Sequence, residues 1–192
     1  ISDFGKAGLL DLRIGLMEKF AGSEMVPGMV PTIYKNLAIV MPRSGEQGRY
    51  GAAGDARAFD LQTGKEVWRF HTVPQPGEEN FGTWGLDAWQ DRRGPGAWVA
   101  MAVDPVNNLV VFGTSNAVDQ NYGAMRPGSN LYASSTIAVE VLRHTAGGVL
   151  WCDGRRLVAH AGGQIVHRAV ADPVADANLQ RLDAVEHVEL GQ

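Results

Sequence analysis

Apolar and polar positions alternate along the first part of the chain in short runs that are separated by turn-forming residues. The apolar run Thr32–Met41 lies between two prolines, which is typical of a buried strand. Two more strand-like runs, Arg57–Asp60 and Glu66–Phe70, flank the segment Gln62–Lys65, which contains a glycine. A tight glycine-containing turn between two such runs predicts a β-hairpin.

Further apolar runs predict strands downstream. Trp98–Val103 and Leu109–Phe112 flank a turn in which proline presets φ and asparagine tolerates the left-handed conformation, so they predict a second hairpin. Ser134–Val139 predicts another strand. The polar, glycine-rich stretch Thr114–Asn130 lies between them as a long loop, and long loops in compact β domains are more often functional than not.

The hairpins share a weak internal repeat. In Ala58–Trp68 an alanine, an acidic residue, a threonine, a glycine and a tryptophan follow one another, and Ala138–Trp151 repeats this order in degraded form. Recurring hairpins that end in tryptophan predict a β-propeller, whose four-stranded blades bury their faces against one another. On pattern alone the fold class is all-β, and other all-β architectures stay open beside the propeller.

Composition narrows the class further. The 192 residues include 24 glycines and 9 prolines, above an ordinary combined usage of about 12 %, which argues against a helical bundle because both residues cost helix stability. The formal net charge of −4 gives no electrostatic reason to expect a nucleic acid partner. The apolar runs are shorter than the roughly 18 residues of a membrane helix. The lone Cys152 excludes an internal disulfide framework.

The composition changes near residue 140. Residues 1–140 hold all four tyrosines and four of the five tryptophans, whereas residues 141–192 contain no lysine, phenylalanine or tyrosine. We therefore expect a strand-and-turn domain over 1–140 and a tail over 141–192 that is a diverged blade, a recombined end or the product of a shifted reading frame. The chain begins at Ile1 without a methionine or the regions of a signal peptide, so we expect an internal piece of a larger protein.

One segment carries a resemblance to a known family. Ala58–Trp68 has the sequence A-F-D-L-Q-T-G-K-E-V-W and resembles the tryptophan docking motif A-x-D-x-x-T-G-K-x-x-W of quinoprotein dehydrogenases. Asp3–Leu12, Gly94–Asn116 and Arg126–Tyr132 resemble further segments of this family in the family's order, with Ser129 in place of an aspartate. The resemblance covers about residues 1–140. It implies an eight-bladed β-propeller, of which this chain holds two to three blades, and an enzyme that uses pyrroloquinoline quinone (PQQ) and calcium.

The resemblance also implies roles for three residues. Trp98 falls on the tryptophan that lies flat against PQQ, and a planar quinone suits a large aromatic surface; a core tryptophan is the alternative. Asn116 falls on an asparagine whose amide oxygen binds calcium, although Ser115 replaces the family's glycine; a turn-capping asparagine is the alternative. Glu46 resembles the family's calcium glutamate, and a solvated loop carboxylate is the alternative.

Other candidate residues are less defined. Trp84 and Trp89 lie in a loop that lines the substrate funnel in relatives, and both funnel lining and packing stay open for them. For His71 a structural role is favoured. The catalytic base remains unknown, because the family supplies it from a segment H-D-x-W-D-x-D and nothing after Trp151 matches that segment.

The favoured hypothesis is part of a PQQ- and calcium-dependent dehydrogenase. By resemblance it oxidises an alcohol or a sugar by hydride transfer, passes electrons to cytochrome c or ubiquinone, and works in the periplasm. The alternatives are a noncatalytic PQQ-like propeller or scaffold and an inactive truncated product without the catalytic base. A scaffold has no need for a flat tryptophan and a calcium-type asparagine at the spacing of Trp98 and Asn116, so this pair separates the hypotheses.

Overall fold

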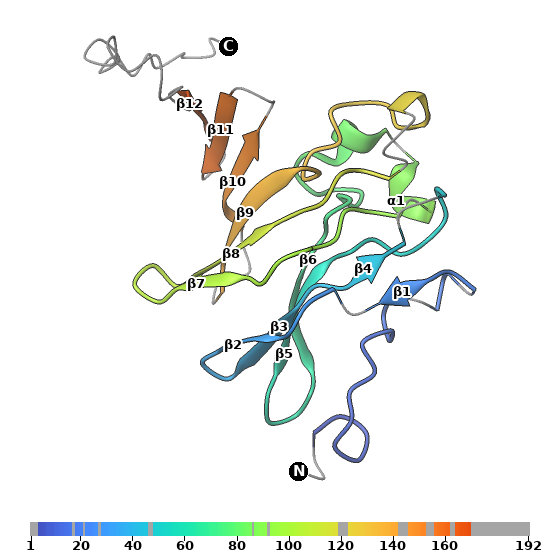
Figure 1. Cartoon of the computed structure of the whole chain (residues 1–192), viewed down its shortest axis with the longest axis vertical. Coiled ribbons are helices and arrows are strands. Elements are labelled where there is room, and N and C mark those ends of the chain that lie inside the picture. The colour runs from blue at the N-terminus through green and yellow to red at the C-terminus, as the bar shows by residue number, and fades with distance from the viewer. Residues whose placement is uncertain are drawn as a thin grey trace.

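The computed structural model describes residues 4–16, 18–20, 22–26, 28–45, 48–85, 87–91, 93–118, 123–141, 146–152, 156–161 and 164–169. Their strands form a four-stranded sheet, a six-stranded sheet and a two-stranded ribbon (Figure 1). Within the described ranges none of the helices is long and apolar enough to cross a membrane. The short helical elements are η1 (Phe81–Trp84), α1 (Ala88–Asp91) and η2 (Gly123–Met125).

The four-stranded sheet is an antiparallel meander of β2 (Thr32–Tyr34), β3 (Leu37–Val40), β5 (Ala56–Asp60) and β6 (Glu66–Phe70). The prediction of one strand over Thr32–Met41 is wrong. The chain reverses at Lys35 and Asn36, where Lys35 adopts a φ of 53°, and Tyr34 pairs with Leu37 across the turn. Two polar residues are enough for this reversal because the tightest hairpin loops need only two. Between β3 and β5 the chain leaves this sheet, and β4 (Arg43–Ser44) pairs with β1 (Met25–Val26).

The hairpin predicted around Gln62–Lys65 is confirmed as β5 and β6, and its turn is held by its own polar side chains. Asp60 Oδ1 accepts hydrogen bonds from the backbone N–H of Gln62 at 3.0 Å and of Thr63 at 2.8 Å. The hydroxyl of Thr63 donates to the same oxygen at 2.9 Å. These bonds, with those from Thr63 the strongest, hold the pKa of Asp60 below its usual 3.8. Gly64 closes the turn with a φ of 71°, which glycine adopts without steric cost.

The six-stranded sheet contains β7 (Ala102–Asp104), β8 (Leu109–Gly113), β9 (Ser135–Glu140), β10 (Ala146–Cys152), β11 (Arg156–Ala161) and β12 (Gln164–Ala169) in spatial order. The second predicted hairpin is confirmed as β7 and β8, and the strand predicted over Ser134–Val139 is confirmed as β9. However, β7 begins only at Ala102, so Trp98 precedes the strand instead of lying in it.

The weak repeat is only partly reproduced by the strand pairing. Ala58 pairs with Trp68 between β5 and β6, whereas Ala138 pairs with Gly148 between β9 and β10. Trp151 lies farther along β10, where it pairs with Ser135. The strand pairs therefore recur, but the tryptophan does not return to the same position.

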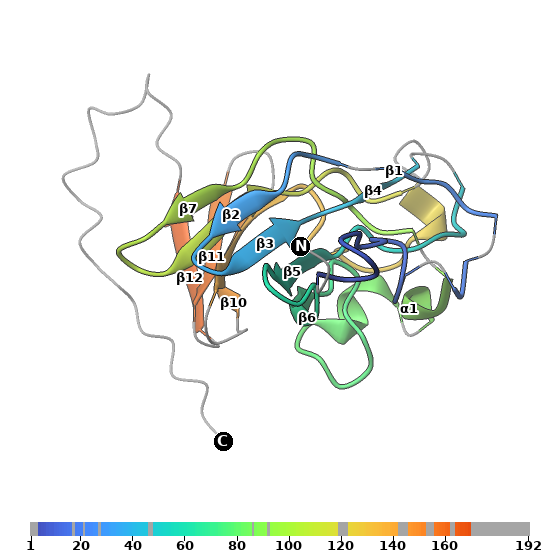
Figure 2. The same ribbon diagram turned by 90° about the horizontal axis from the view of Figure 1, so that it is seen from below.

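The main core lies between the two larger sheets. The turn after β2 meets the turn after β7, where Tyr34 Oη and Lys35 Nζ donate to Asn108 Oδ1 at 3.0 and 2.7 Å (Figure 2). Phe70 of β6 packs edge-on against Phe112 of β8, with ring centroids 6.1 Å apart. Buried residues from both sheets belong to one cluster, which includes Ile39, Ala58, Trp68, Val110, Phe112, Ile137 and Val139.

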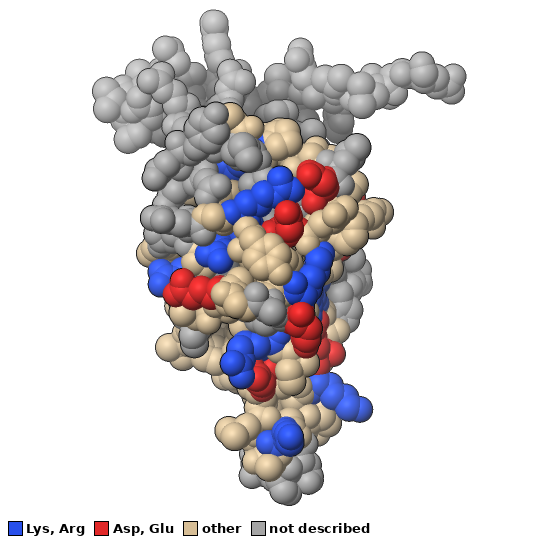
Figure 3. Space-filling model, turned by 90° about the vertical axis from the view of Figure 1, so that its right-hand side faces the viewer, with Lys and Arg blue, Asp and Glu red and all other residues tan. Residues whose placement is uncertain are grey.

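Charged residues of both signs lie mixed on one face of the molecule. On the face shown in Figure 3, lysine and arginine side chains lie among aspartate and glutamate side chains without a large area of one sign. Beneath this surface the carboxylate of Glu66 accepts hydrogen bonds from the buried Arg57 and from the partly exposed Arg69.

Candidate functional site

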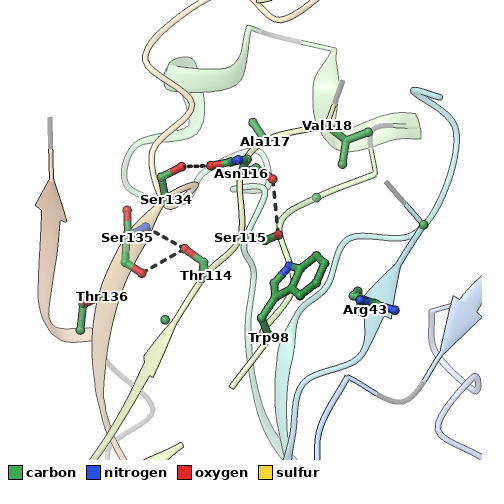
Figure 4. A pocket seen from close by; sticks show the side chains of 13 residues that line it. Arg43, Trp98, Thr114, Ser115, Asn116, Ala117, Val118, Ser134, Ser135 and Thr136 are labelled. Atoms are coloured by element: carbon green, nitrogen blue, oxygen red, sulfur yellow. Dashed lines mark hydrogen bonds between the residues drawn. The ribbon is translucent and has the colours of Figure 1, made fainter. Parts of the chain in front are cut away.

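A pocket of about 470 Å³ opens beside the sheets (Figure 4). Sites for small molecules commonly enclose about 300 to 1,000 Å³. Four separate stretches of chain line it, and these contribute Arg43 and Gly45, Gly94 and Trp98, Gly113–Val118, and Ser134–Thr136.

Trp98 stands open at this pocket. Its side chain is 55 % exposed, although the preceding Ala97 is fully buried. A Cβ on Gly96 would come within 2.7 Å of the carbonyl oxygen of Pro42, so glycine lets this loop run close to the chain that enters β4. That approach brings the guanidinium carbon of Arg43 to 4.6 Å from the centroid of the Trp98 ring. The alternative of Trp98 as a core residue is therefore wrong.

Asn116 lines the same pocket, just beyond the end of β8. Ser134 Oγ donates a hydrogen bond to Asn116 Oδ1 at 2.7 Å, so the amide is tied to the segment before β9 (Figure 4). Ser134 has a φ of 50° and Tyr132 a φ of 82°, both in the left-handed region that costs a residue with a Cβ some strain. Thr114 helps to hold this turn, because its hydroxyl donates to the carbonyl of Tyr132 at 2.5 Å.

Ser115, which replaces the family's glycine, joins the two candidate residues. Its backbone N–H donates to the carbonyl of Gly96 at 2.8 Å. In return, the N–H of Gly96 donates to Ser115 Oγ at 3.1 Å. The loop that carries Trp98 is thus clamped to the segment that carries Asn116, and half of the clamp uses an oxygen that glycine lacks.

Glu46, the third candidate, lies outside the described residues. Its neighbour Gly45 lines the pocket together with Trp98 and Asn116. The structure therefore brings Trp98 and Asn116 to one cavity. The wall of that cavity also includes Gly45, the residue before Glu46.

The sequence analysis gave no role to several side chains that line this pocket, among them Arg43, Thr114 and Ser134. Thr114 lies within a segment that carries the resemblance and Ser134 lies just beyond another, but their contacts join residues 18 positions apart and leave no local pattern. Arg43 directly precedes the Ser-Gly-Glu loop, and this position was the only indication in the sequence that Arg43 lies near the site.

The other candidates lie elsewhere. Trp84 is fully buried in a small apolar cluster, which settles its role as packing. Trp89 and His71 line a second pocket of about 330 Å³, together with Asp55. Burial raises the pKa of the Asp55 carboxyl above 3.8. His71 Nδ1 lies within hydrogen-bond distance of a carboxylate oxygen of Glu78, at 2.7 Å, and this contact agrees with a structural role.

Acidic, histidine and cysteine side chains do not gather into a metal-binding group of three or more within the described part of the chain. The described residues that line the first pocket offer hydroxyl and amide oxygens, together with the guanidinium of Arg43.

Comparisons with known proteins identify a family and several relatives that resemble this chain. The family model described as "Glucose/ethanol/alcohol dehydrogenase, beta-propeller domain", with the short name PQQ, matches residues 1–160. The dehydrogenase subunit of the quinone alcohol dehydrogenase of Gluconobacter oxydans is 36 % identical over an alignment of 107 residues, which covers 47 % of this chain. Quinohemoprotein alcohol dehydrogenase ADH-IIG of Pseudomonas putida is 38 % identical over an alignment of 102 residues, with the same coverage of 47 %. Each match spans only 14 % of the relative's own length.

Solved structures agree with the sequence comparison. Quinohemoprotein alcohol dehydrogenase ADHIIG from Pseudomonas putida HK5 superposes with a TM-score of 0.52 at 25 % identity, over 72 % of this chain and 23 % of that one. A europium-containing methanol dehydrogenase superposes with a TM-score of 0.50 at 17 % identity, over 76 % of this chain and 34 % of that one, which bears on the fold alone. The predicted all-β, propeller-type fold is confirmed, because the matching family model describes a β-propeller domain and the described strands form open sheets that superpose on a quinohemoprotein alcohol dehydrogenase.

Proposed function

The chain belongs to the glucose/ethanol/alcohol dehydrogenase β-propeller family, and on this premise we propose that the pocket beside Trp98 is one wall of a PQQ and metal site in a quinoprotein dehydrogenase. One observation carries the proposal. Trp98 and Asn116 come from different loops and line a single pocket, and Gly45, the residue before Glu46, lines it as well.

The residues present suit a planar quinone. The exposed indole of Trp98 offers a flat apolar face inside a pocket of about 470 Å³. Aromatic rings favour stacked contacts with other flat π-systems, with a gain of about 0.5 to 1.5 kcal/mol beyond simple burial. Gly94 and Gly113 add no side-chain bulk to the walls, so a rigid tricyclic group meets backbone there.

The residues also suit a hard divalent cation such as calcium. Calcium binds six to eight oxygen ligands and accepts neutral amide oxygens together with carboxylates. Asn116 Oδ1 is the amide oxygen, and we assign the carboxylate to Glu46. The hydrogen bond from Ser134 Oγ fixes the orientation of the Asn116 amide, as partners of metal ligands generally do.

With Trp98 and Asn116 holding the two groups, PQQ would supply a hydride acceptor for a substrate C–H bond and the metal would supply Lewis acidity. Trp98 supports one face of the ring system, and the Ser115 clamp keeps that face in register with Asn116. The described residues that line the pocket include no carboxylate and no histidine. The base that takes the hydroxyl proton is therefore left unassigned in this chain.

The wider role follows from the relatives. We propose an alcohol or a sugar as substrate, because the matched relatives are alcohol dehydrogenases. Cytochrome c or ubiquinone would receive the electrons, and the cytochrome route is supported by a relative named lupanine 17-hydroxylase [cytochrome c]. We place the protein in the periplasm on the family resemblance.

Equilibrium dialysis of PQQ against the 192-residue chain tests the proposal, because PQQ is measured by its own absorbance and the number of tryptophans does not matter. We expect binding that needs calcium, that falls at least tenfold in Trp98→Ala, and that loses its calcium dependence in Asn116→Ala. Trp89→Phe and Asn107→Ala are the matched controls, because Trp89 lies at the second pocket and Asn107 in the β7–β8 turn.

Two results would overturn the proposal. Absence of calcium-dependent binding in the unmodified chain would favour a noncatalytic scaffold or an inactive product. Binding that survives Trp98→Ala unchanged would move the PQQ site away from this pocket.

A further inference from the structure

We propose that the second pocket, which is lined by Asp55, His71 and Trp89, binds a neutral polyol such as a monosaccharide. Its volume of about 330 Å³ falls within the range of small-molecule sites, which is about 300 to 1,000 Å³. This inference does not rest on the proposed function, because the described residues that line the second pocket are all different from those that line the pocket beside Trp98.

The first observation is a buried acid whose hydrogen-bonding capacity is only partly used. The side chain of Asp55 is 4 % exposed. Its Oδ1 accepts hydrogen bonds from the backbone N–H of Thr72 at 3.0 Å and from the Thr72 hydroxyl at 3.4 Å. Among the described residues no group donates a hydrogen bond to Oδ2, and His71 Nε2 lies 4.0 Å from it, which is too long for one. Since a buried polar atom without a partner costs free energy, this oxygen favours a ligand that pairs with it.

The second observation is the orientation of the His71 ring. Nδ1 of this ring lies 2.7 Å from a carboxylate oxygen of Glu78. A carboxylate only accepts hydrogen bonds, so Nδ1 carries the hydrogen and Nε2 is left for the pocket. The contact with Glu78 therefore has the structural role, and Nε2 faces Asp55 Oδ2. One ligand hydroxyl reaches both atoms, because two hydrogen bonds of about 2.8 Å easily span their separation.

The third observation is the balance of charge on the walls. Among the described residues that line the pocket, Lys19 and Arg69 are basic and Glu18 and Asp55 are acidic. Two side chains of each sign give neither a cation nor an anion a clear net attraction. Burial also raises the pKa of the Asp55 carboxyl above 3.8. A hydroxyl group donates to a carboxylate and accepts from a carboxylic acid, so it pairs with Asp55 in either form.

Aromatic and amide side chains complete the walls. Trp89 lines the pocket, and Nζ of Lys19 lies 5.0 Å from the centroid of its ring. Gln75 Nε2 donates to the carbonyl of Val73 at 2.9 Å, so the amide oxygen is the end that is left to accept from a ligand. Apolar and polar groups in one pocket suit a molecule with an apolar C–H face and a hydroxyl-bearing edge, which describes a sugar ring.

An NMR titration of the isotope-labelled 192-residue chain with methyl α-glucopyranoside tests the proposal. The indole N–H of Trp89 and the side-chain amide of Gln75 both report on the pocket, and Trp89→Phe identifies the indole signal by its disappearance. We expect saturable shifts of these two signals and an unshifted indole signal for Trp98.

Two charged analogues of the same ring test the charge balance. Methyl α-glucosaminide carries an ammonium group and methyl α-glucuronide carries a carboxylate. We expect each to bind about threefold or more weakly than the neutral glucoside, because a charge loses its hydration in the pocket without a net counter-charge.

Two variants test the walls, with the Gln75 amide as the reporter. In Asp55→Asn the N–H of Thr72 holds the amide oxygen, so an NH₂ group replaces Oδ2, and affinity should fall about tenfold or more. Trp89→Ala should weaken binding several-fold without any change at Asp55, so it decides even if Asp55→Asn does not fold. Asp104→Asn is the matched control, because it makes the same change in the β7–β8 turn and should leave the affinity unaltered. Circular dichroism confirms that each variant keeps its strands.

Four results would overturn the polyol site. These are the absence of saturable shifts, shifts confined to Trp98, tighter binding of either charged analogue, and unchanged affinity in folded Asp55→Asn or in Trp89→Ala. Absence of shifts would mean that ordered water alone satisfies the polar walls. None of these results bears on the proposed function, which the dialysis of PQQ tests at the other pocket.

Discussion

The hairpin β5–β6 and the pocket beside Trp98 each contain a tryptophan, but one tryptophan is buried in the core and the other is exposed to a possible ligand. Trp68 in the hairpin is 5 % exposed and belongs to the main core, whereas Trp98 at the pocket is 55 % exposed. Each region also contains small polar residues, with Asp60 and Thr63 in the hairpin turn and Ser115 at the pocket. The two regions differ in how far apart in the sequence these polar groups and their hydrogen-bond partners lie.

In the hairpin all of these bonds are local. Asp60 Oδ1 accepts from residues two and three positions ahead, so the turn can form as soon as its own residues meet. At the pocket the bonds join distant segments, because Ser115 bonds to Gly96 and Ser134 to Asn116. A segment that is satisfied by its neighbours builds the sheet, and a segment that depends on distant partners is free to present a side chain to a ligand.

Replacement of the two tryptophans by alanine is the largest test of this contrast. Trp68→Ala leaves a cavity in the core between the sheets and should lower the free energy of unfolding by about 3 to 5 kcal/mol. Trp98→Ala should change it by no more than about 0.5 kcal/mol, because most of the side chain already contacts water. Urea titrations followed by circular dichroism measure both values.

A conservative variant sharpens this result. Among the described residues the indole N–H of Trp68 has no hydrogen-bond partner, so Trp68→Phe removes a buried unsatisfied donor while it keeps an aromatic ring. Trp68→Phe should lower the free energy of unfolding clearly less than Trp68→Ala does. Similar large losses for Trp68→Ala and Trp98→Ala would show that both tryptophans are structural, and the contrast would fail.

The same contrast explains how much of the fold the sequence could predict. The β5–β6 hairpin was predicted correctly because Asp60, Thr63 and Gly64 encode their turn within five positions. The reversal at Lys35 and Asn36 was missed because it contains neither glycine nor proline, its left-handed position is occupied by Lys35, and the flanking residues are mostly apolar. Local chemistry gives elements their boundaries, and where it is weak the apolar pattern alone joins two strands into one.

For the site, the sequence could point to residues but not to their environment. Trp98 and Asn116 were found through a resemblance, and the structure brings them to one pocket. Arg43 in β4 stacks on Trp98 in the loop before β7. Because the two residues belong to separate elements, no local sequence pattern predicts this contact. Such contacts exist only after the sheets have packed together, and this is the physical reason that they escaped the sequence analysis.

Ser115→Gly is a test of intermediate size, and it restores the residue of the family pattern. The change removes the oxygen that accepts the N–H of Gly96 and adds backbone freedom, so the free energy of unfolding should fall by about 1 to 2 kcal/mol. PQQ affinity should fall several-fold as well, because the clamp between the loops of Trp98 and Asn116 is loosened. Urea titration and equilibrium dialysis report the two effects separately.

Two further serine variants separate the contributions. Ser115→Ala keeps the Cβ and loses only the side-chain bond, so it isolates the clamp from the flexibility of glycine. Ser129→Gly makes the same change at an exposed loop position and should leave PQQ affinity unaltered. Unchanged affinity in both variants of Ser115 would mean that the clamp has no part in the site.

The smallest expected effect concerns the pH dependence of the hairpin. Hydrogen bonds from Thr63 and Gln62 hold the pKa of Asp60 below its usual 3.8, so the folded chain favours the charged carboxylate. A carboxyl group whose pKa is lowered by folding stabilises the folded chain above its unfolded pKa, and this contribution disappears as the pH falls through the lower folded pKa. The urea midpoint of the unmodified chain should therefore exceed that of Asp60→Asn at pH 6 and approach it as the pH falls well below 3.8.

Trp98→Ala should follow the unmodified chain at every pH, because the pocket does not contribute to this titration. Parallel curves for Asp60→Asn and the unmodified chain would show that the turn does not depend on the charge of Asp60, and the local half of the comparison would then rest on Gly64 and the strand pairing.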